Sequence, residues 1–328
     1  MRFPRPTIFR RVLALAAAAC IAVALASCMR APETALRIGT NVWIGSEPLY
    51  LARELGQLDP SVVQLVEYPS ASEVLRAFRN EAIDGMVISL DELFGLAVDG
   101  LDPRVILVVD VSHGADVVVG RGNMRSMKDL KGKAVAVESG ALGAFVLSRA
   151  LATNGMEASD VEVVHLESNE QPRAFDQGKV DGAVTFDPFR AQLLKSGAKV
   201  LFDSTQIPGE IVDLVAVRAS MVERKPKAIQ ALLKGWFAAI DYLKREPADA
   251  ARRMGIRQQT SGEQFAAGLA GLHIPTREEN LAMIGGPSPQ LASTGKRLMT
   301  LMVDAKLLRS ELPIEKVLEP APLLSMER

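Results

Sequence analysis

The feature that most constrains the fold of this chain is an internal repeat. The stretch that begins Arg76-Ala77-Phe78 recurs without a gap at Arg173-Ala174-Phe175, an offset of 97 residues. In both copies a helix end leads into a small polar turn, then Asp-Gly, and then a short apolar strand. Residues 37–40 and 134–137 align at the same offset, and a third pair of strands aligns within one residue. Chance similarity is the alternative for one stretch alone, but three aligned strands favour a duplicated β-α-β-α-β unit. Two copies predict two α/β lobes and not a solenoid, which needs three or more repeats.

The predicted strands and helices divide the chain into two lobes on mostly parallel sheets. The chain crosses between the lobes twice, near His113 and near Asp213. After Pro226 the pattern predicts amphipathic helices at residues 227–245, 248–254, 262–272 and 291–305, which we expect to cover the first lobe. The predicted boundaries are residues 36–113 and 213–328 for lobe 1, and 114–212 for lobe 2.

The N-terminus has the pattern of a secretion signal. Four arginines precede an apolar run at residues 12–25, which is short for a membrane span and typical of a signal peptide. The run ends in Leu25-Ala26-Ser27-Cys28, which resembles a bacterial lipobox. We expect a signal peptide at 1–27, a lipidated Cys28 and a tether at 28–35, giving a lipid-anchored protein of the cell envelope. Ordinary cleavage with Cys28 incidental is the alternative.

Composition excludes several classes of function. The 328 residues carry a net charge of −1, whereas a nucleic-acid-binding surface needs a basic excess. The only two cysteines lie within the first 28 residues, and the three histidines have no metal-binding spacing. We therefore expect no nucleic-acid partner, no metal and no cofactor.

A ligand is expected beyond the carboxyl ends of the strands, because parallel α/β sheets bind ligands at that edge. Loops of both lobes would line this site, and they carry acidic side chains with no Lys or Arg. This balance disfavours a small anion held by arginines and favours a neutral or amine-bearing ligand. Capping of helices is the alternative role for each acid, and the preferred one for Asp187. The candidate ligand-binding residues are Asn41, Trp43, Ser70, Ser89, Asp91, His113, Asp116, Glu138, Ser139, Gly140, Phe186, Asp187 and Asp213.

Three motifs carry a resemblance to a known family. They are Asn41-x-Trp43 followed by the run at residues 48–52, Asp129-Leu130-Lys131-Gly132-Lys133, and the run at residues 181–188 that ends in Phe186-Asp187-Pro188. Together they resemble the nitrate/sulfonate/taurine-type substrate-binding proteins of ABC importers, a group that includes proteins of thiamine-pyrimidine metabolism. The resemblance implies a type II periplasmic-binding-protein fold that closes about a hinge, with an ABC permease and ATPase as partners. The absence of a basic residue from the predicted loops departs from the anion-binding members.

The expected function is therefore that of an exported solute-binding protein and not of an enzyme. Two alternatives share the fold. One is a sensory partner that docks on a membrane signalling protein. The other is an enzyme of the pyrimidine-precursor type, which would need a nucleophile or anchoring lysine at the ligand edge. Lys128, Lys131 and Lys133 lie at the amino end of a predicted strand, which is the opposite edge.

Overall fold

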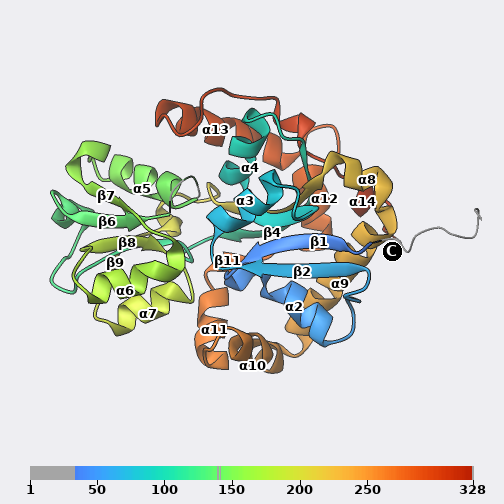
Figure 1. Cartoon of the computed structure of the whole chain (residues 1–328), viewed down its shortest axis with the longest axis horizontal. Coiled ribbons are helices and arrows are strands. Elements are labelled where there is room, and N and C mark those ends of the chain that lie inside the picture. Colours follow the sequence, from blue (N-terminus) through green and yellow to red (C-terminus); the bar gives the residue numbers. More distant parts are fainter. Residues whose placement is uncertain (1–33, 139, 141, 327–328) are drawn as a thin grey trace, which may run out of the picture. The chain divides into compact units, whose positions relative to one another are not determined.

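The computed structural model describes residues 34–138, 140 and 142–326, and residues Leu36–Arg328 form one compact unit (Figure 1). The predicted signal peptide and Cys28 lie outside the described residues. Within the compact unit the chain builds two β-sheets with helices packed on them, so the prediction of an α/β fold is confirmed.

The first sheet has six strands in the order β11-β4-β10-β3-β1-β2. Inner strand β4 is buried from Val105 to Asp110, as its nearly continuous apolar sequence predicts. The strands are β1 (Leu36–Asn41), β2 (Val63–Tyr68), β3 (Gly85–Ser89), β4 (Pro103–Ser112), β10 (Val212–Arg218) and β11 (Leu272–His273).

The second sheet has five strands in the order β7-β6-β8-β5-β9. Helix α5 covers one face of this sheet, and α6 and α7 cover the other (Figure 1). The strands are β5 (Val117–Gly120), β6 (Ala134–Val137), β7 (Glu162–His165), β8 (Gly182–Thr185) and β9 (Lys199–Asp203).

The repeat seen in the sequence is also present in strand register. Strands β3-β1-β2 of the first sheet correspond to β8-β6-β7 of the second, and Ile38 faces Gly85 as Val135 faces Gly182. A Cβ on either glycine would lie within 3 Å of a backbone oxygen of the neighbouring strand, at 2.8 Å and 2.7 Å respectively. Each glycine is therefore required by close approach of an antiparallel strand.

The aspartate of each Asp-Gly pair has a matching role. The backbone N–H of Arg37 donates to Asp84 at 3.0 Å, and that of Ala134 donates to Asp181 at 3.3 Å. Both aspartates thus join the start of one repeat strand to the start of the next. Asp84 also pairs with the buried Lys225 at 3.1 Å.

The sheets are more mixed than the expectation of mostly parallel strands. Strand β10 is antiparallel to β3 and β4, and β5 is antiparallel to β8 and β9. The repeated units themselves are parallel. The difference arises because β5 and β10 follow the two crossings between sheets and so enter with the opposite direction.

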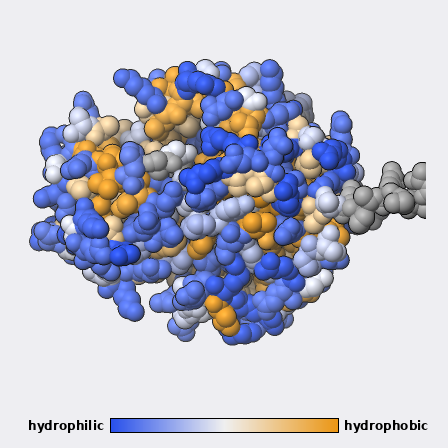
Figure 2. All heavy atoms as spheres, viewed as in Figure 1, coloured by the Kyte–Doolittle hydropathy of each residue, from blue (hydrophilic) through white to orange (hydrophobic). Residues whose placement is uncertain are grey.

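Helices and the apolar core follow the predicted amphipathic pattern. Trp236 of α9 is fully buried in the apolar core of the first sheet, a cluster that also contains Phe78 and Phe94. Charged and polar side chains cover much of the visible face of the molecule, with apolar patches between them (Figure 2). The helices are α2 (Glu47–Glu54), α3 (Ala71–Arg79), α4 (Leu90–Val98), α5 (Leu142–Thr153), α6 (Gln171–Asp176), α7 (Phe189–Lys195), α8 (Ala219–Arg224), α9 (Pro226–Arg245), α10 (Pro247–Arg257), α11 (Gly262–Leu269), α12 (Arg277–Ile284), α13 (Gln290–Asp304) and α14 (Ala321–Leu324).

Candidate functional site

A cavity of about 30 Å³ lies where strands of both sheets end. Strands β1 and β3 of the first sheet end here, β10 begins here, and segments next to β5 and β8 of the second sheet complete the wall. The lining residues are Asn41, Trp43, Ala71, Val87, Ile88, Ser89, Glu92, Asp116, Leu142, Phe186 and Asp213.

A second cavity of about 20 Å³ shares five of these residues, including Glu92, Asp116 and Phe186. It adds side chains of the second sheet, among them Glu138 and Ser168. The two cavities therefore form a small site, lined by apolar and by carboxyl-bearing side chains, at the carboxyl ends of the repeated strands. This is the edge at which ligands bind in α/β folds.

Seven of the residues selected from the sequence line these cavities. They are Asn41, Trp43, Ser89, Asp116, Glu138, Phe186 and Asp213. The strand-end rule located them because the repeat indicates where the parallel strands of both sheets end.

Other selected residues have different places. Ser70 caps α3, accepting from the backbone N–H of Glu73 at 3.3 Å. Asp187 accepts from the N–H of Ala191 at 3.1 Å in α7, which is the capping role preferred from the sequence. His113 and Gly140 are exposed, and Asp91 is buried without lining either cavity. Ser139 lies outside the described residues.

Glu92 is the main lining residue that the sequence reasoning missed. It is the third residue of α4, and its carboxylate accepts from the N–H of Ser89 at 2.9 Å. The signal was present as Ser89-Leu90-Asp91-Glu92, the Ser-x-x-Glu pattern of a capping box. This pattern places a glutamate beside the end of the preceding strand, which here is the ligand edge.

Two glutamates join the sheets reciprocally through helix N-termini. Glu138, at the end of β6, accepts from the N–H of Ser72 in the first turn of α3 at 2.7 Å. Glu92 accepts from the N–H of Leu142, the first residue of α5, at 3.3 Å. Ser168 donates to the other oxygen of Glu138. A helix N-terminus attracts an anion, but each of these termini is already occupied by a carboxyl group of the opposite sheet.

Burial gives the acids of the site raised pKa values. Desolvation raises the pKa of Asp116 to about 6 and of Glu92 to about 8, the latter also because Asp91 lies nearby. Desolvation likewise raises the pKa of Asp110 to about 7, with repulsion from Asp116 contributing. It raises the pKa of Asp213 well above its usual range, with repulsion from Asp110 and Asp116 contributing. The site thus concentrates carboxyl groups that resist ionisation together.

Aromatic rings form the remaining wall. The Trp43 and Phe186 rings meet edge to face with centroids 5.2 Å apart, and Phe186 meets Phe189 at 5.8 Å. Trp43 therefore packs against the second sheet, where it lines the cavity with its ring.

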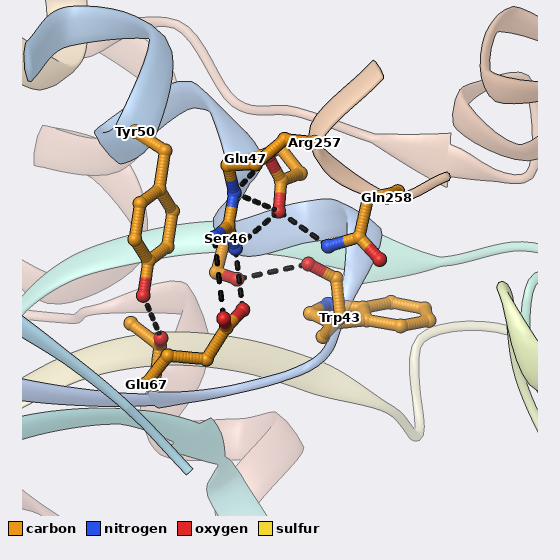
Figure 3. Close-up of polar contacts among 8 residues, drawn as sticks. Trp43, Ser46, Glu47, Tyr50, Glu67, Arg257 and Gln258 are labelled. Carbon is orange, nitrogen blue, oxygen red and sulfur yellow. Dashed lines mark hydrogen bonds and ion pairs between the residues drawn. The ribbon is translucent and has the colours of Figure 1, made fainter. Parts of the chain in front are cut away.

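A buried ion pair supports the segment that carries Trp43 (Figure 3). Glu47, fully buried at the start of α2, accepts from Arg257 at 2.7–2.9 Å and from Gln258. The hydroxyl of Ser46 donates to the Trp43 carbonyl at 2.8 Å and does not cap α2. The C-terminal helices thereby position the loop after β1.

Two larger crevices lie near α10. One of about 410 Å³ is lined by Val42, Phe189 and Lys195 among others, and one of about 540 Å³ by Arg253 and neighbouring residues. Arg257 contributes to both, but its N–H groups are engaged by Glu47 and Glu67. We place the candidate site in the smaller cavities because buried polar groups converge there.

The part of the chain that the structure describes contains no group of three or more His, Cys, Asp or Glu side chains arranged to hold a metal ion. None of the helices in residues 34–326 has both the length and the apolar character needed to cross a membrane.

Comparison with known proteins gives the same fold and identifies the family. The alkanesulfonate-binding protein SsuA of Xanthomonas axonopodis pv. citri, bound to MOPS, superposes with a TM-score of 0.74 at 19% identity, over 88% of this chain and 99% of that one. The desulfurization enzyme DSZB superposes with a TM-score of 0.66 at 15% identity, over 89% of this chain and 98% of that one. These likenesses confirm the periplasmic-binding-protein fold.

A relative in Escherichia coli (strain K12), provisionally named an aliphatic sulfonates-binding protein, is 30% identical over 207 residues. The match covers 60% of this chain and 64% of the relative, somewhat less than two thirds of its length. The resemblance read from the three sequence motifs is thus confirmed. Since the model of the NMT1-like family matches residues 29–256, more than half of the chain, the protein belongs to the NMT1-like family.

Proposed function

We propose that the protein is an exported solute-binding protein that captures a small molecule and delivers it to the permease and ATPase of an ABC importer. Family membership and the likeness to sulfonate-binding proteins support this function. The observation that carries it is the pair of cavities at the strand ends of the two sheets, lined by buried polar groups and aromatic rings.

We further propose that the cavities belong to a cleft between two lobes, with the boundaries expected from the sequence. The chain passes between the sheets at residues 113–116 and 204–211, and these two crossings are hydrogen-bonded to each other. Ser204 Oγ lies 2.8 Å from Ser112 Oγ and accepts from the N–H of Gly114 at 2.6 Å. Crossings held side by side suit a hinge about which the lobes close on the ligand.

The bound solute is proposed to be neutral or amine-bearing. Neither cavity has a Lys, Arg or His among its described lining residues, whereas Glu92, Asp116, Glu138 and Asp213 all contribute carboxyls. The same lining gives no support to the alternative of a pyrimidine-precursor enzyme, since it supplies no nucleophilic lysine or cysteine. The likeness to the desulfurization enzyme concerns the fold alone.

A ligand screen tests the proposed function. Thermal-shift measurements with amines, amino acids, pyrimidines and sulfonates should find a class that raises the melting temperature, because binding to the native state alone stabilises it. A ligand at a hundred times its Kd contributes about 2.7 kcal/mol, which raises the melting temperature of a chain of this size by about 4 °C. A screen in which no class of solute stabilises the protein contradicts the solute-binding function.

Lipid anchoring is proposed at Cys28, which follows Leu25-Ala26-Ser27. Replacing Cys28 by serine should move the protein from the membrane fraction to the soluble fraction after expression in a bacterial host, because the acyl chains that hold it would not be attached. Immunoblotting of the fractions measures the distribution, with Cys20→Ser as the matched control that should remain at the membrane. Retention of Cys28→Ser at the membrane would refute the lipobox interpretation.

A further inference from the structure

The helix N-termini at the site set the charge of the ligand that it accepts. Free N–H groups at the ends of α3 and α5 would attract an anion, but here Glu138 and Glu92 occupy them from the opposite sheet. An anionic ligand would have to displace a buried carboxyl group and then lie among the acids of the site. The geometry of these two contacts therefore disfavours a sulfonate or a carboxylate head group at this position.

Two carboxyl groups, one in the site and one next to it, have oxygens without a hydrogen-bond partner. Asp116 is 2% exposed and lines both cavities, and its Oδ2 has no hydrogen-bond partner. The carboxyl of Asp110 is fully buried next to Asp213 and the indole N–H of Trp43. Neither of its oxygens makes a hydrogen bond with good geometry. Buried acceptors without donors are costly, so a ligand that brings donors would be stabilised here.

Among the described residues, no basic side chain donates a hydrogen bond to these carboxyl oxygens. Arg190 acts on Asp116 through its charge, but its N–H groups donate to Asp187 at 2.5 Å and to the carbonyl of Gly114 at 2.9 Å. The hydrogen bonds of Arg190 are therefore made to residues Gly114 and Asp187 and not into the cavity. A cation from outside would supply both the missing charge and the missing donors.

A metal ion fits less well than an organic cation. Hard cations such as Ca²⁺ take six or more oxygen ligands, and no group of three or more acidic or histidine side chains is arranged for a metal within the described residues. The aromatic rings of Trp43 and Phe186 instead offer faces and edges for an organic ligand.

We propose that the ligand of this protein carries an N–H-donating cationic head group, such as a primary ammonium, which binds at Asp116 and Asp213 beside Trp43. This inference rests on the proposed solute-binding function and narrows it from a neutral or amine-bearing solute to a protonated amine. The small cavity suits this group, because about 10–15 Å³ holds one water-sized group and about 30 Å³ is present. It also separates this chain from relatives named for sulfonate binding.

A series of four-carbon compounds that differ only in the head group tests the proposal. Butylamine, butan-1-ol, butane-1-sulfonate and butyltrimethylammonium are titrated against the protein by thermal shift and by ligand-observed NMR. Butylamine should bind at least tenfold more tightly than the other three, because only it combines positive charge with N–H donors. Tighter binding of the sulfonate, or equal binding of the alcohol or of the quaternary amine, overturns the proposal and leaves the solute-binding function standing. If none of the four binds but the wider screen finds a ligand, the amine proposal fails alone. If that screen also fails, both fail.

Two variants locate the binding group. Asp116→Asn should weaken butylamine binding about tenfold or more, the loss expected for a hydrogen bond to a charged group, without unfolding the protein. Asp213→Asn should also weaken butylamine binding, and this second variant tests the proposal if Asp116→Asn folds poorly. Asp181→Asn is the matched control, because this aspartate precedes the opposite end of β8 and pairs with Arg121. Unchanged affinity in both site variants contradicts the assignment.

Discussion

The melting temperature of the ligand-free protein should fall by about 5 °C or more when the pH is raised from 5 to 8. The cause is burial of carboxyl groups, which raises the pKa of Asp91 and Asp116 to about 6, of Asp110 to about 7 and of Glu92 to about 8. Repulsion from Asp110, after burial, helps to raise the pKa of Asp213.

The sign follows from linkage. These folded-state pKa values lie above the unfolded values near 4, so the folded protein holds protons that the unfolded chain releases. The stabilisation is fully present below about pH 4 and is lost as the pH rises through 6 to 8. The expected loss of folding stability is on the order of 4 kcal/mol. One pKa unit corresponds to about 1.4 kcal/mol, and the pKa shifts of neighbouring acids are coupled, so their contributions do not add in full.

Differential scanning calorimetry at several pH values measures this loss, and Asp110→Asn provides the test of its origin. The variant should melt higher than the unchanged protein at pH 8 and should show a smaller pH dependence. The exposed pair His273–Glu279, at 3.3 Å, is retained in the variant. Asp84 does not interfere, because Arg37 and Lys225 hold its pKa at about 2. A melting temperature that is flat between pH 5 and 8 would contradict the description of the site as a cluster of buried acids.

Replacing Arg257 by leucine should destabilise the protein by about 3–5 kcal/mol, the cost of leaving one member of a buried ion pair uncompensated. Glu47 is fully buried and receives hydrogen bonds from Arg257 Nε and Nη2 at 2.7–2.9 Å (Figure 3). Arg257 also pairs with Glu67 at 2.5 Å and stacks on the ring of Tyr50 at 3.5 Å. Its loss would remove packing as well as charge.

Urea unfolding measures this cost, and Arg253→Leu is the matched control. Arg253 lies on the same helix and makes two ion pairs at 2.5 Å, with Glu54 and Asp249. Its partners are much more exposed than Glu47, so its replacement should cost no more than about 1 kcal/mol. In the double variant Arg257→Leu with Glu47→Gln, much of the lost stability should return because no charge remains buried. Equal costs for the two arginine variants would refute a special role for the Glu47–Arg257 pair.

The C-terminal helices show where pattern reading from the sequence reached its limit. The amphipathic pattern predicted α9, α10, α11 and α13, but not α12 or its role. Asn280 of α12 is fully buried, donating to the carbonyl of Val108 at 3.1 Å and accepting from the N–H of the same residue at 2.6 Å. A pattern within one helix does not reveal a partner 172 residues away in β4.

By itself the sequence determined the framework of this protein. The internal repeat predicted two sheets with matching strand units, and the ends of those strands located seven of the residues that line the cavities. These features are local or periodic, so they can be read along the chain. Only the tertiary structure decided that Glu92 and Glu138 occupy helix N-termini of the opposite sheet, and that Arg257 supports the segment carrying Trp43. Such contacts join residues between 50 and 210 positions apart. A buried charged group needs a partner of opposite charge or a hydrogen-bond partner, and the fold can supply that partner from a distant part of the chain. The periodicity of the sequence does not show which residue it is.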